Sequence, residues 1–278
     1  MGAPLISIVA TYYNVKPLIK LKIVLVDITI VIYLIYLYKS FFTYLELFKD
    51  LKKIMNDLSL IIPAKNEPES LPYVLKELEK LKLNFFVLME KNDYVTINAI
   101  EKYKSNIIFQ KNKGFGDAVN HGLENVKTKY FLIFNADGSM DPNEIPRFIE
   151  KFNKHETDLV FASRYLKNGE SEDDTIITFI GNKLFSLIGK IFFSLELSDI
   201  LYTYVMGKTK EVQNLNLKNK DFRFCVELPI KAKRNKLKIE EISSKEKRRI
   251  GGYKKVNDFK DGFLILLEIM RLYFNRKE

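Results

Sequence analysis

From residue 57 onward, short apolar runs alternate with stretches in which apolar side chains recur every three or four residues. Leu58–Ile62 has the length of a buried strand, and Glu69–Lys82 carries its apolar residues at helical spacing. The pattern then predicts strands at 85–89, 107–109, 130–134 and 159–162, and helices at 95–104, 117–126 and 142–152. This alternation predicts an α/β fold, a mostly parallel sheet with flanking helices and right-handed crossovers.

The second half of the chain is less regular. Residues 169–174 form an acidic loop, and residues 176–197 are apolar with few charges. That apolar stretch fits two structures equally well, amphipathic helices that lie on a bilayer surface or a pair of core helices. A late strand is predicted at 237–242, a basic segment covers 245–255, and residues 261–274 form an apolar helix at the C-terminal end.

The front of the chain has a different character. Residues 23–38 are almost entirely apolar, and a membrane span needs about 20 such residues with about 17 as a lower limit. Asp27 lies near the start of the run, where a charge reaches the interface at lower cost. We therefore predict a tail at 1–22, a membrane-anchor helix at 23–48 and a folded domain at 57–274. A cleaved signal peptide and a buried helix are the alternatives.

The charge and composition of the chain limit the classes of ligand and partner that it could bind. The chain has 278 residues, a formal net charge of +10 and an isoelectric point near 9.3. Such a balance suits anionic lipid, phosphorylated ligands or nucleic acid. No zinc-finger spacing or nucleic-acid motif occurs, so no nucleic-acid partner is predicted. The single cysteine, Cys225, excludes an internal disulfide, and two histidines supply little metal or triad chemistry.

The most informative chemistry follows the strand predicted at 130–134. That strand ends in the polar cluster Asn135-Ala-Asp-Gly-Ser139. Ligands of open α/β sheets bind outside the carboxyl ends of the strands. A carboxylate at that place, on a turn that contains glycine, is suited to holding a divalent cation against a diphosphate. The plain alternative is a solvated Asp-Gly turn.

Four segments in one order resemble a known family. They are Ser59–Leu71, Lys111–Gly122 with its Gly-x-Gly, Asn135–Ser139 at the place of an Asp-x-Asp motif, and the basic Arg249–Lys255. Together they resemble family 2 glycosyltransferases of the GT-A fold, in particular polyprenyl-phosphate sugar synthases of the dolichyl-phosphate mannose synthase group. The resemblance covers residues 57 to 270.

The resemblance implies roles for individual residues. Asp137, Asp199 and Arg164 would be catalytic, and Mg²⁺ or Mn²⁺ would be held by Asp137 with Asn135 and Ser139. Arg164, Arg249 and Lys255 would meet the phosphate of the acceptor. The donor nucleotide would be bound by Pro63, Ala64, Lys65, Asn66, Glu67, Glu90, Asp93, Lys113, Gly114, Gly116, Asp117 and Asn135.

The sequence departs from the family pattern at three places. Asn135 stands where the family has the first aspartate of Asp-x-Asp. Glu90-Lys91 replaces a pair of aspartates, which leaves a UDP- or GDP-linked donor open. No arginine occurs between Arg164 and Arg223, where relatives that use lipid phosphate carry one.

We therefore predict a membrane-associated, inverting, metal-dependent glycosyltransferase. It would move a sugar from a nucleotide-diphosphate donor to a polyprenyl phosphate, with its catalytic domain on the cytoplasmic face. One alternative keeps the fold but transfers to a glycan or lipid hydroxyl, for which Asp199 would be the general base. A further alternative is an inactive partner subunit that binds nucleotide or membrane. The sequence specifies no oligomeric state.

Overall fold

The computed structural model describes residues 32–46, 49–103 and 106–275, and the chain divides into two compact units. In the first unit, Met1–Asp50, residues 32–46 are helical and their large apolar side chains are exposed. The predicted anchor at 23–48 falls partly outside the described residues and stays a prediction. The second unit, Leu51–Glu278, contains the sheet and its helices.

The second unit is built on a seven-stranded sheet with the order β3-β2-β1-β4-β7-β5-β8. All neighbours pair in parallel except β7, which is antiparallel to both β4 and β5. A two-stranded sheet joins β6 to β9. The strands are β1 Leu58–Pro63, β2 Asn84–Met89, β3 Asn106–Phe109, β4 Tyr130–Ile133, β5 Leu159–Ser163, β6 Glu170–Ser171, β7 Val205–Lys208, β8 Ile239–Ser243 and β9 Lys245–Glu246.

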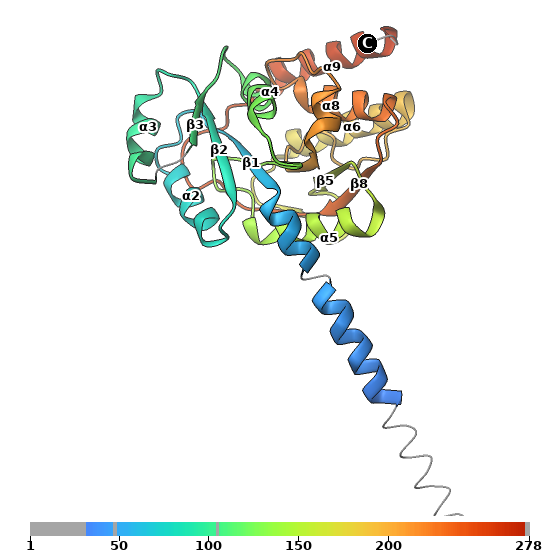
Figure 1. The fold of residues 1–278 in the computed structure, drawn as a ribbon. Helices are drawn as coiled ribbons and strands as arrows, with labels where there is room; N and C mark the ends of the chain where they lie inside the picture. The colour runs from blue at the N-terminus through green and yellow to red at the C-terminus, as the bar shows by residue number, and fades with distance from the viewer. Residues whose placement is uncertain (1–31, 47–48, 104–105, 276–278) are drawn as a thin grey trace, which may run out of the picture. The chain divides into compact units, whose positions relative to one another are not determined.

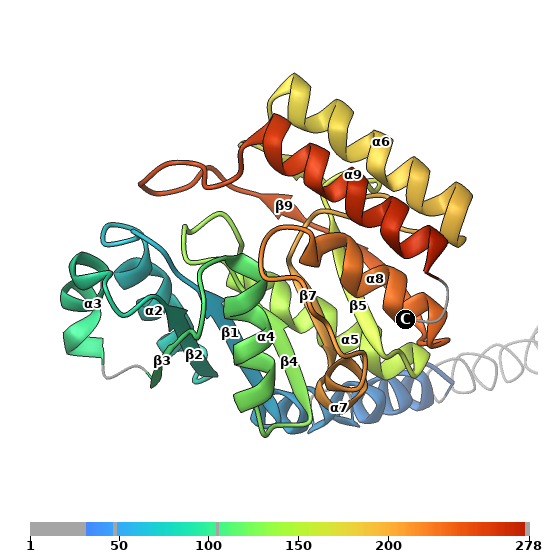
Figure 2. The ribbon, with the colours of Figure 1, turned by 90° about the horizontal axis from the view of Figure 1, so that it is seen from above.

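Helices cover both faces of the sheet (Figure 1). One core joins the sheet to α2 and α5, and the other joins it to α4, α8 and α9. α6 and α9 lie side by side beyond the second face (Figure 2). The helices are α2 Leu71–Lys80, α3 Tyr94–Ile100, α4 Phe115–Asn125, α5 Ile145–His155, α6 Ile176–Phe193, α7 Thr209–Gln213, α8 Phe224–Arg234 and α9 Asp258–Phe274, with 3-10 turns at Glu101–Tyr103 and Pro142–Glu144.

The residues of β1 show why the strands read as continuous apolar runs. Side chains alternate along a strand, so Leu58, Leu60 and Ile62 enter the core with α2 and α5, whereas Ile61 enters the core with α4. Because helices cover both faces, both sets are mostly apolar, and the one polar member, Ser59, accepts a hydrogen bond from Thr128 at 2.9 Å. The fold class predicted from the sequence, a mostly parallel α/β sheet of the GT-A type with flanking helices, is confirmed.

Five of the described elements were not predicted from the sequence, namely β6, β7, α7, α8 and β9. β7 is only four residues long, and α8 carries Pro229 within an otherwise helical segment. The apolar stretch at 176–197 is one helix, α6, which ends where Ser194 adopts a left-handed conformation with φ of 54°. Within the described residues, α6 is the helix whose length and apolar composition would allow it to cross a membrane, and 17% of it is buried.

The strand order places the candidate site. From β1 the chain proceeds through β2 to β3 on one side, and then returns to β4 on the other side of β1. A crevice therefore opens between the carboxyl ends of β1 and β4, and such switch points bind ligands in open α/β sheets. Pro63 ends β1, and Asn135 follows closely after β4. The two segments singled out from the sequence thus meet at one edge of the sheet.

Gly207 gives a test of the sheet packing. A Cβ atom at Gly207 on β7 would lie 2.6 Å from a ring carbon of Phe131 and 2.7 Å from a methyl carbon of Leu159. Both neighbours are fully buried. We expect Gly207→Val to lower the free energy of unfolding by about 3 kcal/mol through overpacking, measured by chemical denaturation of the full chain.

Gly262 supplies the matched control. No atom lies within 4 Å of a Cβ added to Gly262 in α9. Gly262→Ala should therefore raise the free energy of unfolding by about 0.5 to 1 kcal/mol through helix propensity. Equal effects of the two substitutions would contradict the packing described for β7.

Candidate active site

A cavity of about 540 Å³ opens at the switch point of the sheet. Several residues predicted to bind the donor nucleotide line this cavity, and so do the three cationic residues predicted to meet the acceptor phosphate. The predicted residues that line it are Pro63, Ala64, Lys65, Glu67, Glu90, Gly114, Asn135, Asp137, Arg164, Arg249 and Lys255. Those that do not are Asn66, Asp93, Lys113, Gly116, Asp117, Ser139 and Asp199.

Asp137 is held by its own turn. Its Oδ1 accepts hydrogen bonds from the backbone N–H of Ser139 at 3.0 Å and from the Ser139 hydroxyl at 2.7 Å. Gly138 has φ of 81°, which favours glycine. Because Oδ1 of Asp137 is occupied by Ser139, Oδ2 of Asp137 is the oxygen left to face a ligand. The buried Ser139 hydroxyl orients Asp137.

The residues at this turn fit a divalent cation that relies on its substrate for ligands. Within the described residues, no group of three or more histidine, cysteine or acidic side chains could hold a metal ion. Asp137 and the amide oxygen of Asn135, which accepts a hydrogen bond from Thr203 at 3.3 Å, are the oxygen donors after β4. Mg²⁺ is commonly held by one or two carboxylates together with substrate phosphates and water.

The loop after β1 is braced from two sides. Asp93 caps α3 and also accepts a hydrogen bond from the backbone N–H of Asn66 at 2.7 Å. Glu67 pairs with Lys255 at 3.0 Å, and Lys65 pairs with Glu90 at 2.8 Å. Asp93 therefore acts on the cavity through the backbone of this loop.

The two glycines at the start of α4, Gly114 at its N-cap and Gly116 in its first turn, have a reason that the sequence did not reveal. A Cβ at Gly114 would lie 2.2 Å from the carbonyl oxygen of Lys220, and one at Gly116 would lie 2.4 Å from that of Asn219. The N–H of Asp117 already donates to the Lys220 carbonyl at 2.9 Å. The glycines are thus required by the close approach of the chain segment before α8.

Arg164 is the most highly paired side chain of the cavity. It forms two hydrogen bonds with Asp199, at 2.7 Å and 3.0 Å, and a third with Glu246 at 3.1 Å. Asp174 lies 3.5 Å away, and the ring of Tyr202 packs 4.6 Å from the guanidinium. Asp199 is fully buried, so its carboxylate is engaged by Arg164 and does not face the cavity.

Glu246 was missed by the sequence analysis. Burial raises its pKa above the ordinary value, although Arg164 and the Ser171 hydroxyl oppose this shift. The signal available in the sequence was an isolated acid in a strongly basic segment. Cys225 also lines the cavity, and burial raises the pKa of its thiol to about 12, so the thiol is neutral.

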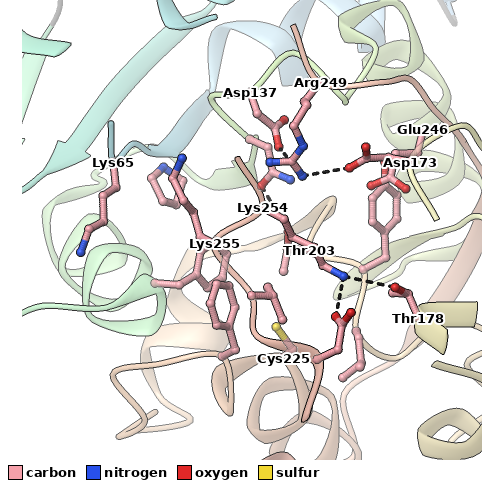
Figure 3. Close-up of a pocket in the computed structure, with 18 of the residues that line it drawn as sticks. Lys65, Asp137, Asp173, Thr178, Thr203, Cys225, Glu246, Arg249, Lys254 and Lys255 are labelled. Carbon is pink, nitrogen blue, oxygen red and sulfur yellow. Dashed lines mark hydrogen bonds and ion pairs between the residues drawn. The ribbon is translucent and has the colours of Figure 1, made fainter. Parts of the chain in front are cut away.

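The basic segment after β9 closes one side of the cavity (Figure 3). Arg249 lies between two carboxylates, 2.9 Å from Asp173 and 3.8 Å from Asp137. Lys254, which was also missed, donates to the Thr178 hydroxyl at 3.1 Å. The acidic loop and the basic segment, far apart in sequence, therefore lie in direct contact in the wall of the site.

The part of the cavity between α6 and α9 is mostly apolar. It extends between α6 and α9, where Gly181 and Gly262 leave open space because no atom lies within 4 Å of an added Cβ. Most other side chains of this limb are apolar or small, namely Ile177, Phe185, Leu201, Phe222, Cys225 and Ile265, and α6 and α9 add the polar Thr178, Asn182 and Asp258. The cavity can therefore hold a ligand with a charged end and an apolar end.

Fold and site together define an α/β protein of the GT-A type, with a ligand cavity at the sheet switch point and a carboxylate after the fourth strand. The family model described as "Glycosyl transferase family 2" matches residues 59–215. The chain belongs to glycosyl transferase family 2 and is a glycosyltransferase.

Two curated relatives are similar in sequence. A dolichol-phosphate mannosyltransferase of Pyrococcus furiosus is 26% identical over 191 residues, which cover 65% of this chain and 54% of the relative. An uncharacterized protein of Methanocaldococcus jannaschii is 23% identical over 198 residues, which cover 68% of this chain and 81% of that protein. The chain thus spans about half the length of the first of these relatives.

Solved structures share the fold. Glucosyl-3-phosphoglycerate synthase from Mycobacterium tuberculosis, in complex with Mn²⁺, UDP and glucosyl-3-phosphoglycerate, has a TM-score of 0.61 and 11% identity, covering 80% of this chain and 83% of that chain. Its complex with Mn²⁺ and UDP-glucose has a TM-score of 0.60 and 12% identity, covering 79% and 82%.

The contribution of the buried ion pair between Arg164 and Asp199 can be tested by measuring the free energy of unfolding. Asp199→Asn keeps the side-chain shape but removes the charge that balances Arg164. Breaking a buried ion pair by removing one partner is costly, so we expect the free energy of unfolding to fall by about 3 kcal/mol. Asp173→Asn, at a side chain that is 28% exposed, should cost less than about 1 kcal/mol. Equal small losses would show that Arg164 does not depend on Asp199.

Proposed function

We propose that this glycosyltransferase moves a sugar, with inversion, from a UDP- or GDP-linked donor to a polyprenyl phosphate. One observation carries the proposal, namely that a single cavity joins the polar turn of Asp137 to an apolar limb between α6 and α9. A nucleotide diphosphate fits the polar end, and a lipid phosphate fits the apolar end. The name of the Pyrococcus furiosus relative supports this acceptor.

The polar end supports a metal-dependent transfer. Asp137 and Asn135 would hold Mg²⁺ or Mn²⁺, which supplies charge neutralisation of the departing diphosphate. The Mn²⁺ and Mg²⁺ complexes of the structural neighbours support this choice of ion. Lys255, braced by Glu67, and Arg249 contribute positive charge to the wall of the same cavity. A phosphate acceptor is already anionic near neutral pH, so the chain need not supply a general base.

The apolar end supports attachment to a membrane. The outer faces of α6 and α9 expose large apolar side chains in two neighbouring rows, which suits helices that lie in a bilayer interface. These exposed residues are Ile176, Ile177, Phe179, Ile180, Leu184, Leu187, Ile191 and Phe192 on α6, and Phe259, Phe263, Leu266, Leu267, Met270 and Phe274 on α9. The segment at 23–48 would add an anchor, and the catalytic domain would face the cytoplasm.

A hydroxyl acceptor is the second candidate, and the charges at the acceptor side favour it. Asp173 and Asp174 line the cavity and belong to the segment after Arg164, where no arginine occurs; Glu246 lines the cavity as well. A hydroxyl acceptor needs a general base. Asp199 is buried against Arg164, so that base would have to be a carboxylate that lines the cavity, such as Asp173, Asp174 or Glu246.

Transfer to lipid tests the main proposal. Labelled sugar from UDP- and GDP-sugars should appear in polyprenyl phosphate in detergent with Mn²⁺, and a chelator should abolish it. Asp137→Asn should lower the rate by at least about a hundredfold, because it removes the charge that holds the cation.

Asp141→Asn is the matched control for that assay. Asp141 follows in the same loop, pairs with Lys247 at 2.9 Å and does not line the cavity. This variant should keep its rate within about threefold. Label in a glycan or a lipid alcohol instead of the lipid phosphate would favour the hydroxyl acceptor. Absence of both transfer and nucleotide binding would favour the inactive partner subunit.

The apolar limb can be tested separately. Gly181→Leu would fill the space between α6 and α9, whereas Gly181→Ala adds one methyl group to open space. We expect the leucine variant to lower transfer to long polyprenyl phosphate by at least about tenfold, and the alanine variant to have little effect. Nucleotide affinity should not change. If a long and a short prenyl phosphate lose activity equally, the limb does not hold the lipid chain.

A further inference from the structure

We propose that Arg249 is an internal counter-ion of Asp137, which competes with the divalent cation for Oδ2 and turns to the donor diphosphate once the cation binds. This inference rests on the metal-dependent transfer proposed above. It makes the affinity for the metal and the affinity for the nucleotide depend on each other through one side chain.

The two carboxylate oxygens of Asp137 have different surroundings. Oδ1 is occupied by the N–H and hydroxyl of Ser139. Oδ2 faces a guanidinium nitrogen of Arg249 at 3.8 Å. A divalent cation that binds through Oδ2 must therefore share this oxygen with the charge of Arg249. The cation and the guanidinium would then lie close together and repel each other strongly, because water is partly excluded from the site.

Asp173 is the second carboxylate partner of Arg249. Asp173 of the acidic loop accepts a hydrogen bond from the same guanidinium at 2.9 Å, and the Arg249 side chain is only 21% exposed. Burial by itself would lower the pKa of Arg249, but Asp173 and Asp137 raise it above the ordinary value. The guanidinium thus stays charged while it turns between these carboxylates.

The backbone around Asp137 and Arg249 is held by hydrogen bonds. The N–H of Lys247 donates to the carbonyl of Ser139 at 2.8 Å, and that of Ile250 donates to the carbonyl of Asp137 at 2.9 Å. Ile250 also packs over Gly138, where an added Cβ would lie 2.5 Å from the isoleucine side chain. The metal turn and the basic segment are therefore tied together, so the side chain of Arg249 has to move without its backbone.

The effect of Arg249 on the affinity for the cation therefore reverses when nucleotide binds. Without nucleotide, the charge of Arg249 opposes the cation. A diphosphate bound beside the cation brings negative charge, which attracts the same guanidinium and offers it the bidentate geometry that arginine prefers. Arg249 then favours the complex, and coupling of this kind is reciprocal between the two ligands. The cation and the nucleotide should therefore bind far more tightly together than separately.

The test measures Mn²⁺ binding to the full chain in detergent, from the electron paramagnetic resonance signal of free Mn²⁺. Arg249→Gln should bind Mn²⁺ alone about fivefold more tightly than the wild type. With UDP or GDP present, whichever the wild type binds, the same variant should bind Mn²⁺ less tightly than the wild type.

Arg248→Gln is the matched control, because it removes the same charge from the neighbouring, exposed residue. Its Mn²⁺ affinity should change by less than about twofold in both conditions. Asp173→Asn should weaken binding of Mn²⁺ alone, because Arg249 then turns fully to Asp137. That loss should be smaller when Arg249→Gln is also present.

Three results would overturn the inference. Arg249→Gln could match Arg248→Gln in Mn²⁺ affinity without nucleotide, or it could weaken Mn²⁺ binding in both conditions. Either result leaves the proposed metal-dependent transfer intact, because the wild type still binds Mn²⁺ and nucleotide together. If neither the wild type nor Arg249→Gln binds Mn²⁺ in either condition, both the inference and the proposed metal dependence are wrong.

Discussion

The structure of the acceptor side depends on one buried cation, Arg164. Its guanidinium ties the end of β5 to Asp199 before β7, to Glu246 of β9 and to Asp174 of the acidic loop. A buried charge is tolerated only when it is paired and hydrogen-bonded. These segments must therefore assemble around Arg164, and their assembly sets the position of the basic segment that follows β9.

Charge balance in the cavity differs from charge balance in the chain. The chain carries a formal net charge of +10, yet the described side chains that line the cavity include seven carboxylates and only five cations. The carboxylates are Glu67, Glu90, Asp137, Asp173, Asp174, Glu246 and Asp258, and the cations are Lys65, Arg164, Arg249, Lys254 and Lys255. Every one of these cations has a carboxylate partner. Such a cavity receives a diphosphate more readily together with a divalent cation, which agrees with the proposed use of a metal.

Much of the candidate site could be read from local sequence. Apolar runs that end in Pro63 or Asn135 identify strands and the polar positions at their carboxyl ends, and parallel strands bring those ends to one edge. Gly114 was predicted to bind the donor nucleotide, but its close approach to the Lys220 carbonyl was not predicted, because Lys220 is distant in sequence. The role of Asp199 was likewise hidden, since nothing local reveals that Arg164 occupies it.

The sequence by itself determined the alternation of strands and helices, the α/β class and the family motifs, because periodicity and motif order are local properties of the chain. Only the tertiary structure decided that β7 inserts antiparallel between β4 and β5, since a four-residue strand is too short to carry a periodic signal. It also decided that Arg249 faces both Asp137 and Asp173, and that α6 and α9 leave an apolar limb between them. Such contacts join residues that lie far apart in sequence, so no local pattern can specify them.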